Sequence, residues 1–151
     1  MPLVTCQENL RSKLLTNMEI LLPDLDLPDF KYWYGGTVVS VYDADTIRVK
    51  LDLGLGLKMA GLGIEGKGIS LRLFGIDAFE VRGSERPHGL EARDFVRELI
   101  DSKQLIINTI LDKTGKYGRL LARIFVEIEP GLWLDLNQEL VNNGYARLVE
   151  Y

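Results

Sequence analysis

Alternation between apolar and polar residues predicts that much of this chain forms β-strands. The segment 46–53 shows the pattern best, because its odd-numbered residues are apolar and its even-numbered residues are polar or charged. A period of two places all the apolar side chains on one face of a strand. Similar patterns predict further strands. They cover residues 37–42, 69–77, 104–111 and 119–128, and a last extended segment covers residues 145–149.

The N-terminal part of the chain has the pattern of an amphipathic helix. Over residues 6–21, leucine and methionine side chains recur every three or four positions behind a capping box formed by Thr5 and Glu8. We expect residues 1–28 to form this helix and a linker, and residues 29–151 to form a single domain. The apolar stripe of the helix also suggests self-association through this segment.

Two more helices are expected within the β-rich region. Apolar residues at helical spacing follow Pro87 and Gly89 and end at Ile100. Asp135 can cap a short helix that ends before Gly144. The expected order is helix, three strands, helix, two strands, helix and a short strand. This order predicts an α+β protein, mainly β, with a five-stranded barrel of the OB type and a helix after the third strand.

Composition fits one globular domain and excludes several other classes. The chain has 151 residues, of which 46% are hydrophobic and 26% are charged. Its single cysteine, Cys6, excludes an internal disulfide framework. The N-terminus lacks a basic start followed by an apolar run, and no stretch approaches the roughly 18 apolar residues of a spanning helix. We therefore expect a cytoplasmic protein without a membrane partner.

Charge is unevenly spread along the chain. The formal net charge is −4, yet residues 80–123 hold nine basic and seven acidic side chains, whereas residues 1–45 hold three basic and seven acidic ones. The middle of the chain is therefore the part expected to face an anionic ligand. The alternative is that these charges only solvate exposed faces.

Two patterns resemble nucleotide-binding motifs but lack the helix that should follow them. Residues 61–66 match the dinucleotide fingerprint, and residues 61–67 nearly match a phosphate-binding loop. Both motifs need a helix to follow, and here the next segment is predicted to be a strand. We therefore expect no dinucleotide cofactor and interpret the glycine-rich residues 54–68 as a hairpin excursion. Because His88 is the only histidine, a catalytic triad or zinc site built on histidine is also excluded.

Carboxylates and arginines at the ends of the predicted strands carry the candidate chemistry. Asp43 and Asp45 lie between two strands, whereas Asp77 and Glu80 follow a segment that contains Arg72. Taken alone, the two aspartates are more typical of a turn, and it is the three motifs of matching chemistry at strand ends that favour a site. Without histidine or paired cysteines, a metal has to be held by oxygen, which selects Ca²⁺ or Mg²⁺. Because arginine beside such a cation binds phosphate diesters, the pattern indicates a metal-dependent phosphodiesterase.

Several motifs, in this order, resemble those of the staphylococcal-nuclease-like (thermonuclease) family. They are an aspartate-x-aspartate-threonine element at residues 43–46, a strand from arginine to glutamate at residues 72–80, and a lysine-tyrosine-glycine-arginine element at residues 116–119. Residues 137–146 also resemble the family's late helix and its glycine-alanine ending. The resemblance covers residues 36–151 and implies an OB-fold core with Ca²⁺-dependent endonuclease activity.

The resemblance implies a set of metal ligands. Asp45 and Asp77 would bind one Ca²⁺ ion directly, together with the main-chain carbonyl of Ala78, and Mg²⁺ is the less favoured ion. Asp43 and Thr46 would lie just behind these ligands and support them.

The resemblance also implies residues that act on the substrate. Glu80 would orient or deprotonate the attacking water, and Arg72 and Arg119 would bind the phosphate and neutralise its growing charge. Lys116 and Tyr117 would contact the terminal phosphate of a bound strand. The implied reaction cleaves DNA and RNA with little sequence specificity and leaves 3′-phosphate ends. The family usually has a proline just before the glutamate, where this chain has Phe79.

Two other functions are compatible with the sequence. One is a non-catalytic OB-fold module that binds single-stranded nucleic acid or a protein partner. The other is a structural component that acts through the N-terminal helix. Domains of this family that have lost activity normally lack one or more of the site residues. The arginines, metal aspartates and glutamate are all present here, which favours the enzyme with DNA or RNA as its partner.

Overall fold

β-Strands are the main elements of this protein. The computed structural model describes residues 32–60, 67–110 and 120–150. The described strands are β1 (Trp33–Asp43), β2 (Thr46–Gly54), β3 (Leu57–Met59), β4 (Ile69–Leu73), β5 (Ile76–Ala78), β6 (Leu105–Ile110), β7 (Leu120–Glu129), β8 (Leu132–Asp135) and β9 (Ala146–Leu148). The described helices are α2 (Arg86–Ile100) and α3 (Leu136–Asn142), and a short 3₁₀ turn (Gly83–Glu85) leads into α2.

The strand pairings return to their starting point. β1 pairs with both β2 and β6, and β2 pairs with β4, all antiparallel. β4 runs parallel to β7, which pairs with β6 and so leads back to β1. β3 and β8 are attached outside this ring of pairings, and β5 and β9 form a separate two-stranded sheet. This mixed arrangement is consistent with the predicted α+β fold of the OB type.

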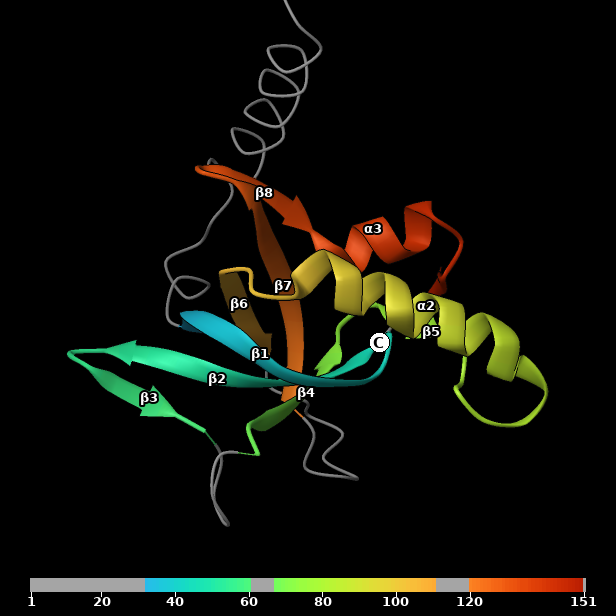
Figure 1. Cartoon of the computed structure of the whole chain (residues 1–151), viewed down its shortest axis with the longest axis horizontal. Helices are drawn as coiled ribbons and strands as arrows, with labels where there is room; N and C mark the ends of the chain where they lie inside the picture. Colours follow the sequence, from blue (N-terminus) through green and yellow to red (C-terminus); the bar gives the residue numbers. More distant parts are fainter. Residues whose placement is uncertain (1–31, 61–66, 111–119, 151) are drawn as a thin grey trace, which may run out of the picture.

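The interior is built from the apolar faces that the sequence pattern predicts. Fully buried aliphatic side chains come from strands of the ring and from both helices: Ile47, Val49, Leu71, Leu73, Ile107, Ile124, Val96, Ile100, Leu136 and Leu140. Burial of one such side chain contributes about 1.5–3 kcal/mol relative to exposure, so these faces dominate the stability of the domain. Figure 1 shows both helices on the same side of the strands, to the right of β7 and β8.

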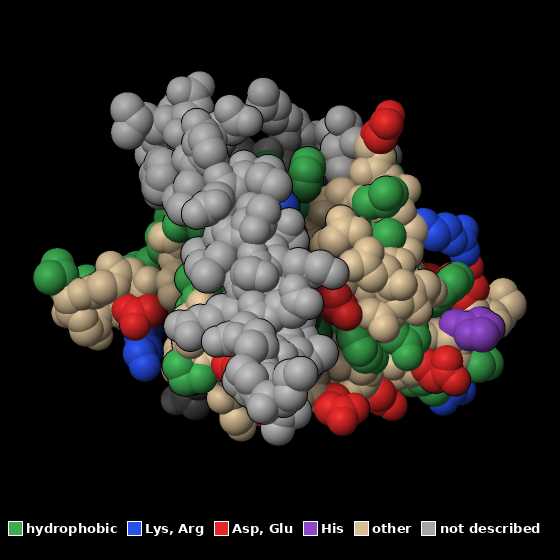
Figure 2. Space-filling model, turned by 90° about the horizontal axis from the view of Figure 1, so that it is seen from above, with side chains coloured by type: hydrophobic (Ala, Val, Ile, Leu, Met, Phe, Trp, Pro, Cys, Tyr) green, Lys and Arg blue, Asp and Glu red, His purple; other side chains and the backbone are tan. Residues whose placement is uncertain are grey.

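The β2–β3 hairpin extends beyond the ring. Its turn is made by Gly54, Leu55 and Gly56, all of which have positive φ angles. Leu53 was predicted to face inward but is 46% exposed, because the last residue pair between β1 and β2 is Gly35 with Asp52. The hairpin projects at the left of Figure 2, with apolar side chains at its tip. Part of the predicted glycine-rich excursion is therefore a hairpin, while residues 61–66 lie outside the described residues.

One predicted strand is wrong in an informative way. The segment 69–77 was predicted as a single strand, whereas the structure has two strands, β4 and β5, separated by Phe74 and Gly75. The apolar pattern continues through the break, but Gly75 adopts a φ of 75° that turns the chain. β5 then pairs with β9 instead of extending the ring. The turn places Arg72 of β4 and Asp77 of β5 side by side, with 3.0 Å between Arg72 Nη2 and Asp77 Oδ1.

Most of the other predicted elements are confirmed within the described residues. Strands β1, β2, β6, β7 and β9 and helices α2 and α3 lie where the pattern indicated, whereas β3 and β8 were not predicted. Asp135 caps α3 as expected, since its carboxylate accepts a hydrogen bond from the backbone of Gln138 at 3.2 Å. The expected N-terminal helix and the boundary between residues 28 and 29 lie outside the described residues. Neither described helix has the length and apolar character needed to cross a membrane.

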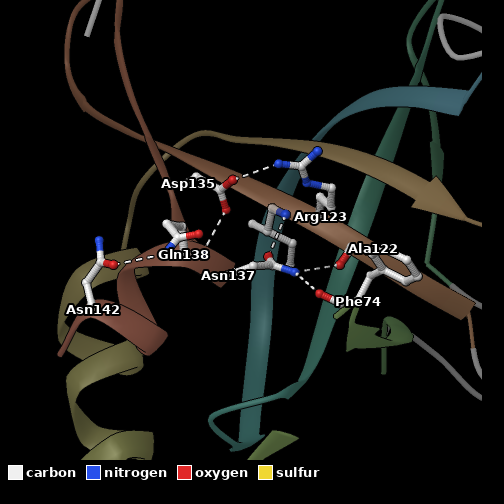
Figure 3. A network of polar contacts seen from close by, with 8 residues as sticks. Phe74, Ala122, Arg123, Asp135, Asn137, Gln138 and Asn142 are labelled. Atoms are coloured by element: carbon white, nitrogen blue, oxygen red, sulfur yellow. Dashed lines mark hydrogen bonds and ion pairs between the residues drawn. The ribbon is translucent and has the colours of Figure 1, made fainter. Parts of the chain in front are cut away.

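A buried asparagine holds the turn between β4 and β5. The Nδ2 of Asn137 donates hydrogen bonds to the carbonyl oxygens of Phe74 at 2.9 Å and Ala122 at 3.2 Å. Its Oδ1 accepts a hydrogen bond from the backbone N–H of Ile124 at 3.2 Å. Figure 3 shows these contacts converging from α3 onto β7 and the turn. Asn137 thus satisfies three backbone groups and fixes the segment that carries Arg72 and Asp77.

Candidate active site

Asp45 joins three parts of the fold at one point. It lies in the tight turn between β1 and β2, and it is 5% exposed. Its Oδ1 accepts a hydrogen bond from the Thr46 hydroxyl at 3.2 Å, and its Oδ2 accepts one from the backbone N–H of Ala78 at 3.0 Å. Its main-chain carbonyl accepts a further bond from the backbone of Leu73 at 2.9 Å. The side chain is therefore held rigidly between the turn and strands β4 and β5.

Arg72 lies between two of the predicted metal ligands. Its Nη2 is 3.0 Å from Asp77 Oδ1 and 3.6 Å from Asp45 Oδ2. The Asp45 side chain is buried, whereas the Asp77 side chain is 52% exposed. A guanidinium between two carboxylates compensates part of their charge and keeps them close. The structure thus brings together one arginine and two aspartates that the sequence predicted to act together.

Asp43 adds a carboxyl group whose charge is poorly compensated. Burial raises the pKa of Asp43 from its ordinary value of 3.8 to about 6, and hydrogen bonding with Asp45 and the charge of Asp45 add to the shift. The hydroxyl of Thr46 lowers this pKa, and the charge of Glu80 raises it further. Asp43 Oδ1 is buried and has no hydrogen-bond partner among the described residues. Asp43, Asp45 and Glu80 therefore concentrate negative charge beside Arg72.

Glu80 is held through its backbone by a chain of contacts that the sequence did not predict. Its N–H donates a hydrogen bond to Glu85 Oε2 at 3.2 Å, and Glu85 Oε1 forms an ion pair with Arg147 Nη2 at 3.3 Å. The Arg147 guanidinium also lies 5.3 Å from the ring centre of Phe79. The His88 ring also lies near this ring, with 5.6 Å between ring centres. Phe79, at the position where a proline was expected, is thus packed between two side chains.

Gly89 allows α2 to approach this segment closely. A Cβ atom at this position would lie 2.1 Å from the carbonyl oxygen of Glu80 and 2.8 Å from the backbone nitrogen of Val81. Only glycine permits such a contact between a helix and a neighbouring backbone. The sequence pattern placed Gly89 just before the predicted helix, whereas it lies inside α2, so this close packing was not predicted. The contact between Glu85 and Arg147 was not predicted either, because 62 residues separate them in the sequence.

The donor chemistry of the site fits a hard cation. Asp45 and Asp77 offer carboxylate oxygens close to the same Arg72 nitrogen, and the buried Asp43 Oδ1 has no hydrogen-bond partner among the described residues. Such an arrangement suits Ca²⁺ better than a softer metal. Across the described ranges, however, no three histidine, cysteine, aspartate or glutamate side chains form a group that could hold a metal ion. The remaining ligands would therefore be main-chain carbonyls or water, which is common for Ca²⁺.

Three of the predicted site residues lie outside the described residues. Lys116, Tyr117 and Arg119 belong to residues 111–119. The neighbouring described strand, β7, begins at Leu120, which pairs with Leu71 of β4. The next pair along these parallel strands is Leu121 with Arg72. The chain therefore enters β7 beside the strand that carries Arg72.

Comparisons with known proteins show which family this sequence matches. A sequence model of the family described as staphylococcal nuclease homologue matches residues 70–151. A thermonuclease from Staphylococcus hyicus is 28% identical over 117 residues, which cover 76% of this chain and 59% of that protein. This chain thus spans less than two thirds of the length of that relative. The family match contains Arg72, Asp77 and Glu80, whereas Asp43 and Asp45 precede it.

Proposed function

This chain belongs to the staphylococcal nuclease homologue family, and from that premise we propose that it is a metal-dependent nuclease. It hydrolyses phosphodiester bonds of DNA, RNA or both, with little sequence specificity. The observation that carries this proposal is the cluster of Arg72 with Asp45 and Asp77, next to Glu80. A phosphate diester needs positive charge and a base at one place, and these groups supply that chemistry.

The proposed metal ion is a single Ca²⁺. Asp45 and Asp77 would hold it through their side chains, and Ala78 would hold it through its main-chain carbonyl. When bound, the ion would supply positive charge that stabilises the negative charge of the transition state. Asp43 and Thr46 support the ligand Asp45, since the Thr46 hydroxyl bonds to one of its oxygens.

Glu80 is the proposed general base. It accepts a proton from the attacking water, and the fixed backbone N–H restricts where its carboxylate can lie. Proximity of this kind matters, because a shift of about 1 Å in a catalytic group can reduce the rate roughly a hundredfold. The Phe79 ring, packed by Arg147 and His88, supports the same segment in place of the fixed φ angle of a proline.

Arg72 and Arg119 are the proposed phosphate ligands. A guanidinium remains charged at every physiological pH, and its planar fork matches two phosphate oxygens. Charge that develops on these oxygens in the transition state is therefore stabilised more strongly than charge in the bound substrate. Lys116 and Tyr117 would contact the terminal phosphate of the bound strand, and cleavage would leave a 3′-phosphate and a 5′-hydroxyl.

The metal requirement is tested with an exposed ligand and a matched control. Asp77→Asn removes one proposed ligand from a half-exposed side chain, and Asp101→Asn removes an exposed carboxylate at the end of α2. Cleavage of single-stranded DNA should require Ca²⁺, stop in EDTA, and fall at least tenfold in Asp77→Asn alone. Ca²⁺ binding measured by calorimetry should weaken in the same variant.

Other outcomes of this experiment distinguish the alternatives. Cleavage that is equal in all variants, including Arg119→Ala, would come from a contaminating nuclease. Intact Ca²⁺ binding without any cleavage would overturn the enzymatic proposal in favour of a binding module. Cleavage that persists in EDTA would refute the metal requirement.

A further inference from the structure

An open pocket lined by arginines lies beside the candidate active site. It has a volume of about 550 Å³ and is bounded by the end of β1, by residues 81–83 and by one face of α2 from Arg86 to Arg97. Arg82, Arg86, Arg93 and Arg97 line it, and we call it the arginine pocket. Its other lining residues are apolar or aromatic, apart from a glycine, and no acidic side chain lines it among the described residues.

The helical repeat explains why these arginines converge. Arg86, Arg93 and Arg97 lie seven and four residues apart along α2, which places them on one face of the helix. Leu90 lies between them on the same face and also lines the pocket. Arg82 reaches the pocket from the segment that precedes the helix. Four of the nine basic side chains of residues 80–123 are therefore gathered at one pocket.

Most of the positive charge in the pocket is uncompensated. Asp94 is 2.8 Å from Arg93 and 3.7 Å from Arg97, and Arg97 also donates a hydrogen bond to the carbonyl oxygen of Val41 at 2.9 Å. Within the described residues, neither Arg82 nor Arg86 forms an ion pair. The nearby carboxylate of Glu85 is occupied by Arg147 and by the Glu80 backbone. One carboxylate thus faces four guanidinium groups.

Two stretches of the chain that line the pocket lead directly into residues of the candidate active site. Val41 and Tyr42 line it, and the next residue is Asp43. Val81 and Arg82 line the other wall, and the preceding residue is Glu80. In Figure 2, basic side chains lie at the end of the molecule opposite the hairpin, near the single histidine, which is in the first turn of α2.

We propose that the arginine pocket binds the sugar-phosphate backbone of a single-stranded nucleic acid next to the bond that is cleaved. Arginine forks suit phosphate oxygens, and the ring of Tyr42, which is 50% exposed with Arg82 5.9 Å from its centre, offers a surface on which a base stacks. The inference rests on the proposed nuclease function and extends it. The site engages several nucleotides instead of one phosphodiester.

Binding without cleavage tests this proposal separately from catalysis. The double variant Arg82→Ala/Arg86→Ala removes the two arginines without ion pairs, and Arg48→Ala/Lys58→Ala removes two positive charges from β2 and β3. Binding of a labelled 12-nucleotide single strand is measured by fluorescence anisotropy in EDTA. The pocket variant should bind at least tenfold more weakly, and the slope of log K against log salt should fall by about 1.4, since each phosphate contact contributes about 0.7. The control should change less than twofold.

Cleavage then separates the two proposals. With Ca²⁺, the pocket variant should lose kcat/KM on the long strand but keep it on a dinucleotide, which does not reach the pocket. Equal weakening of single-strand binding in the pocket variant and the control would overturn the proposed role of the pocket. So would unchanged binding of the long strand. If the wild type never cleaves but the pocket variant still loses binding, the result would support the pocket proposal and reject the proposed nuclease activity.

Two single substitutions with smaller expected effects on folding test the proposal in case the double variant does not fold. Arg86→Gln changes one exposed side chain at the start of α2, and its thermal unfolding should match that of the wild type. It should weaken binding of the long strand threefold or more. Tyr42→Leu should weaken binding to a similar extent without changing the salt slope, because stacking releases no counterions. If neither variant weakens binding, the proposal is wrong.

Discussion

At the scale of single residues, the site depends on groups buried just behind it. Asp43 is 8% exposed, and its carboxyl group faces the charges of Asp45 and Glu80. Gly89 provides space for the backbone of Glu80 instead of a side chain. Neither residue needs to touch substrate to matter. One sets the electrostatic potential at the site, and the other sets the position of the proposed base.

Asp43 gives the metal-free protein a characteristic pH dependence. Its folded-state pKa of about 6 lies above the ordinary value of 3.8, so folding favours the protonated carboxyl. The resulting stabilisation is complete below about pH 4 and is lost as the pH rises through 6. Asp43→Asn should therefore be more stable than the wild type at pH 7 by about 2–3 kcal/mol, and about equally stable at pH 3.5.

Urea unfolding in EDTA, from pH 3.5 to 7.5, measures this difference. Asp101→Asn, which changes an exposed carboxylate, should follow the wild type across the whole range. A constant difference between Asp43→Asn and the wild type at every pH would contradict the assignment.

Gly89→Ala should impair both folding and activity. The added Cβ would meet backbone atoms of Glu80 and Val81, which cannot rotate away. We expect a loss of roughly 1–3 kcal/mol in the free energy of unfolding, and a lower cleavage rate in the folded fraction. Gly35→Ala is the matched control, because its new Cβ would meet its nearest atom at an ordinary 3.8 Å. Equal stability of the two variants would show that α2 can shift freely.

At the scale of elements, the turn between β4 and β5 is the most informative feature. It brings Arg72 and Asp77 into contact, and Asn137 of α3 holds it from behind (Figure 3). The loop from β5 to α2 carries Glu80 and is tied to β9 by Glu85 and Arg147. Helix α3 and strand β9 thus position the site although none of the predicted catalytic residues lies on them.

Asn137→Ala should destabilise the fold through unsatisfied backbone groups. The variant leaves the N–H of Ile124 and the carbonyl of Phe74 without their asparagine partner. Each buried unsatisfied group costs about 1–3 kcal/mol, so we expect a loss of roughly 2–4 kcal/mol in chemical denaturation. Asn143→Ala, at an exposed position after α3, should cost less than about 1 kcal/mol. Similar losses in both variants would reject this role for Asn137.

The ion pair between Glu85 and Arg147 should affect activity more than stability. Both side chains are substantially exposed, at 41% and 66%, so the pair itself contributes only about 0–1 kcal/mol. Arg147→Met removes the support for Phe79 and Glu85, and the cleavage rate should fall roughly tenfold through misplacement of Glu80. Thermal unfolding and single-turnover kinetics measure the two effects. A large loss of stability with an unchanged rate per folded molecule would contradict this positioning role.

At the scale of the whole molecule, the sequence pattern predicted the strands better than their connections. Alternation identified β2, and Asp135 marked the start of α3, because both signals are local. The break at Gly75 was missed because the apolar pattern runs through it, and the pairing of β5 with β9 depends on residues about seventy positions apart. The sequence also predicted that Asp45, Asp77 and Arg72 come together, because their motifs lie at the ends of predicted strands. The Glu85–Arg147 pair and the arginine pocket were not predicted, since tertiary packing alone creates them.

The central claim is that this molecule cleaves phosphodiesters with Glu80 as the base. It is tested most directly by the single-turnover cleavage rate of Glu80→Gln on single-stranded DNA at saturating Ca²⁺, beside the wild type and the exposed control Glu129→Gln. We predict that the rate falls at least about a hundredfold in Glu80→Gln alone, as expected for loss of a general base. DNA binding measured in parallel should change less than threefold. A Glu80→Gln rate within twofold of the wild type would contradict the account.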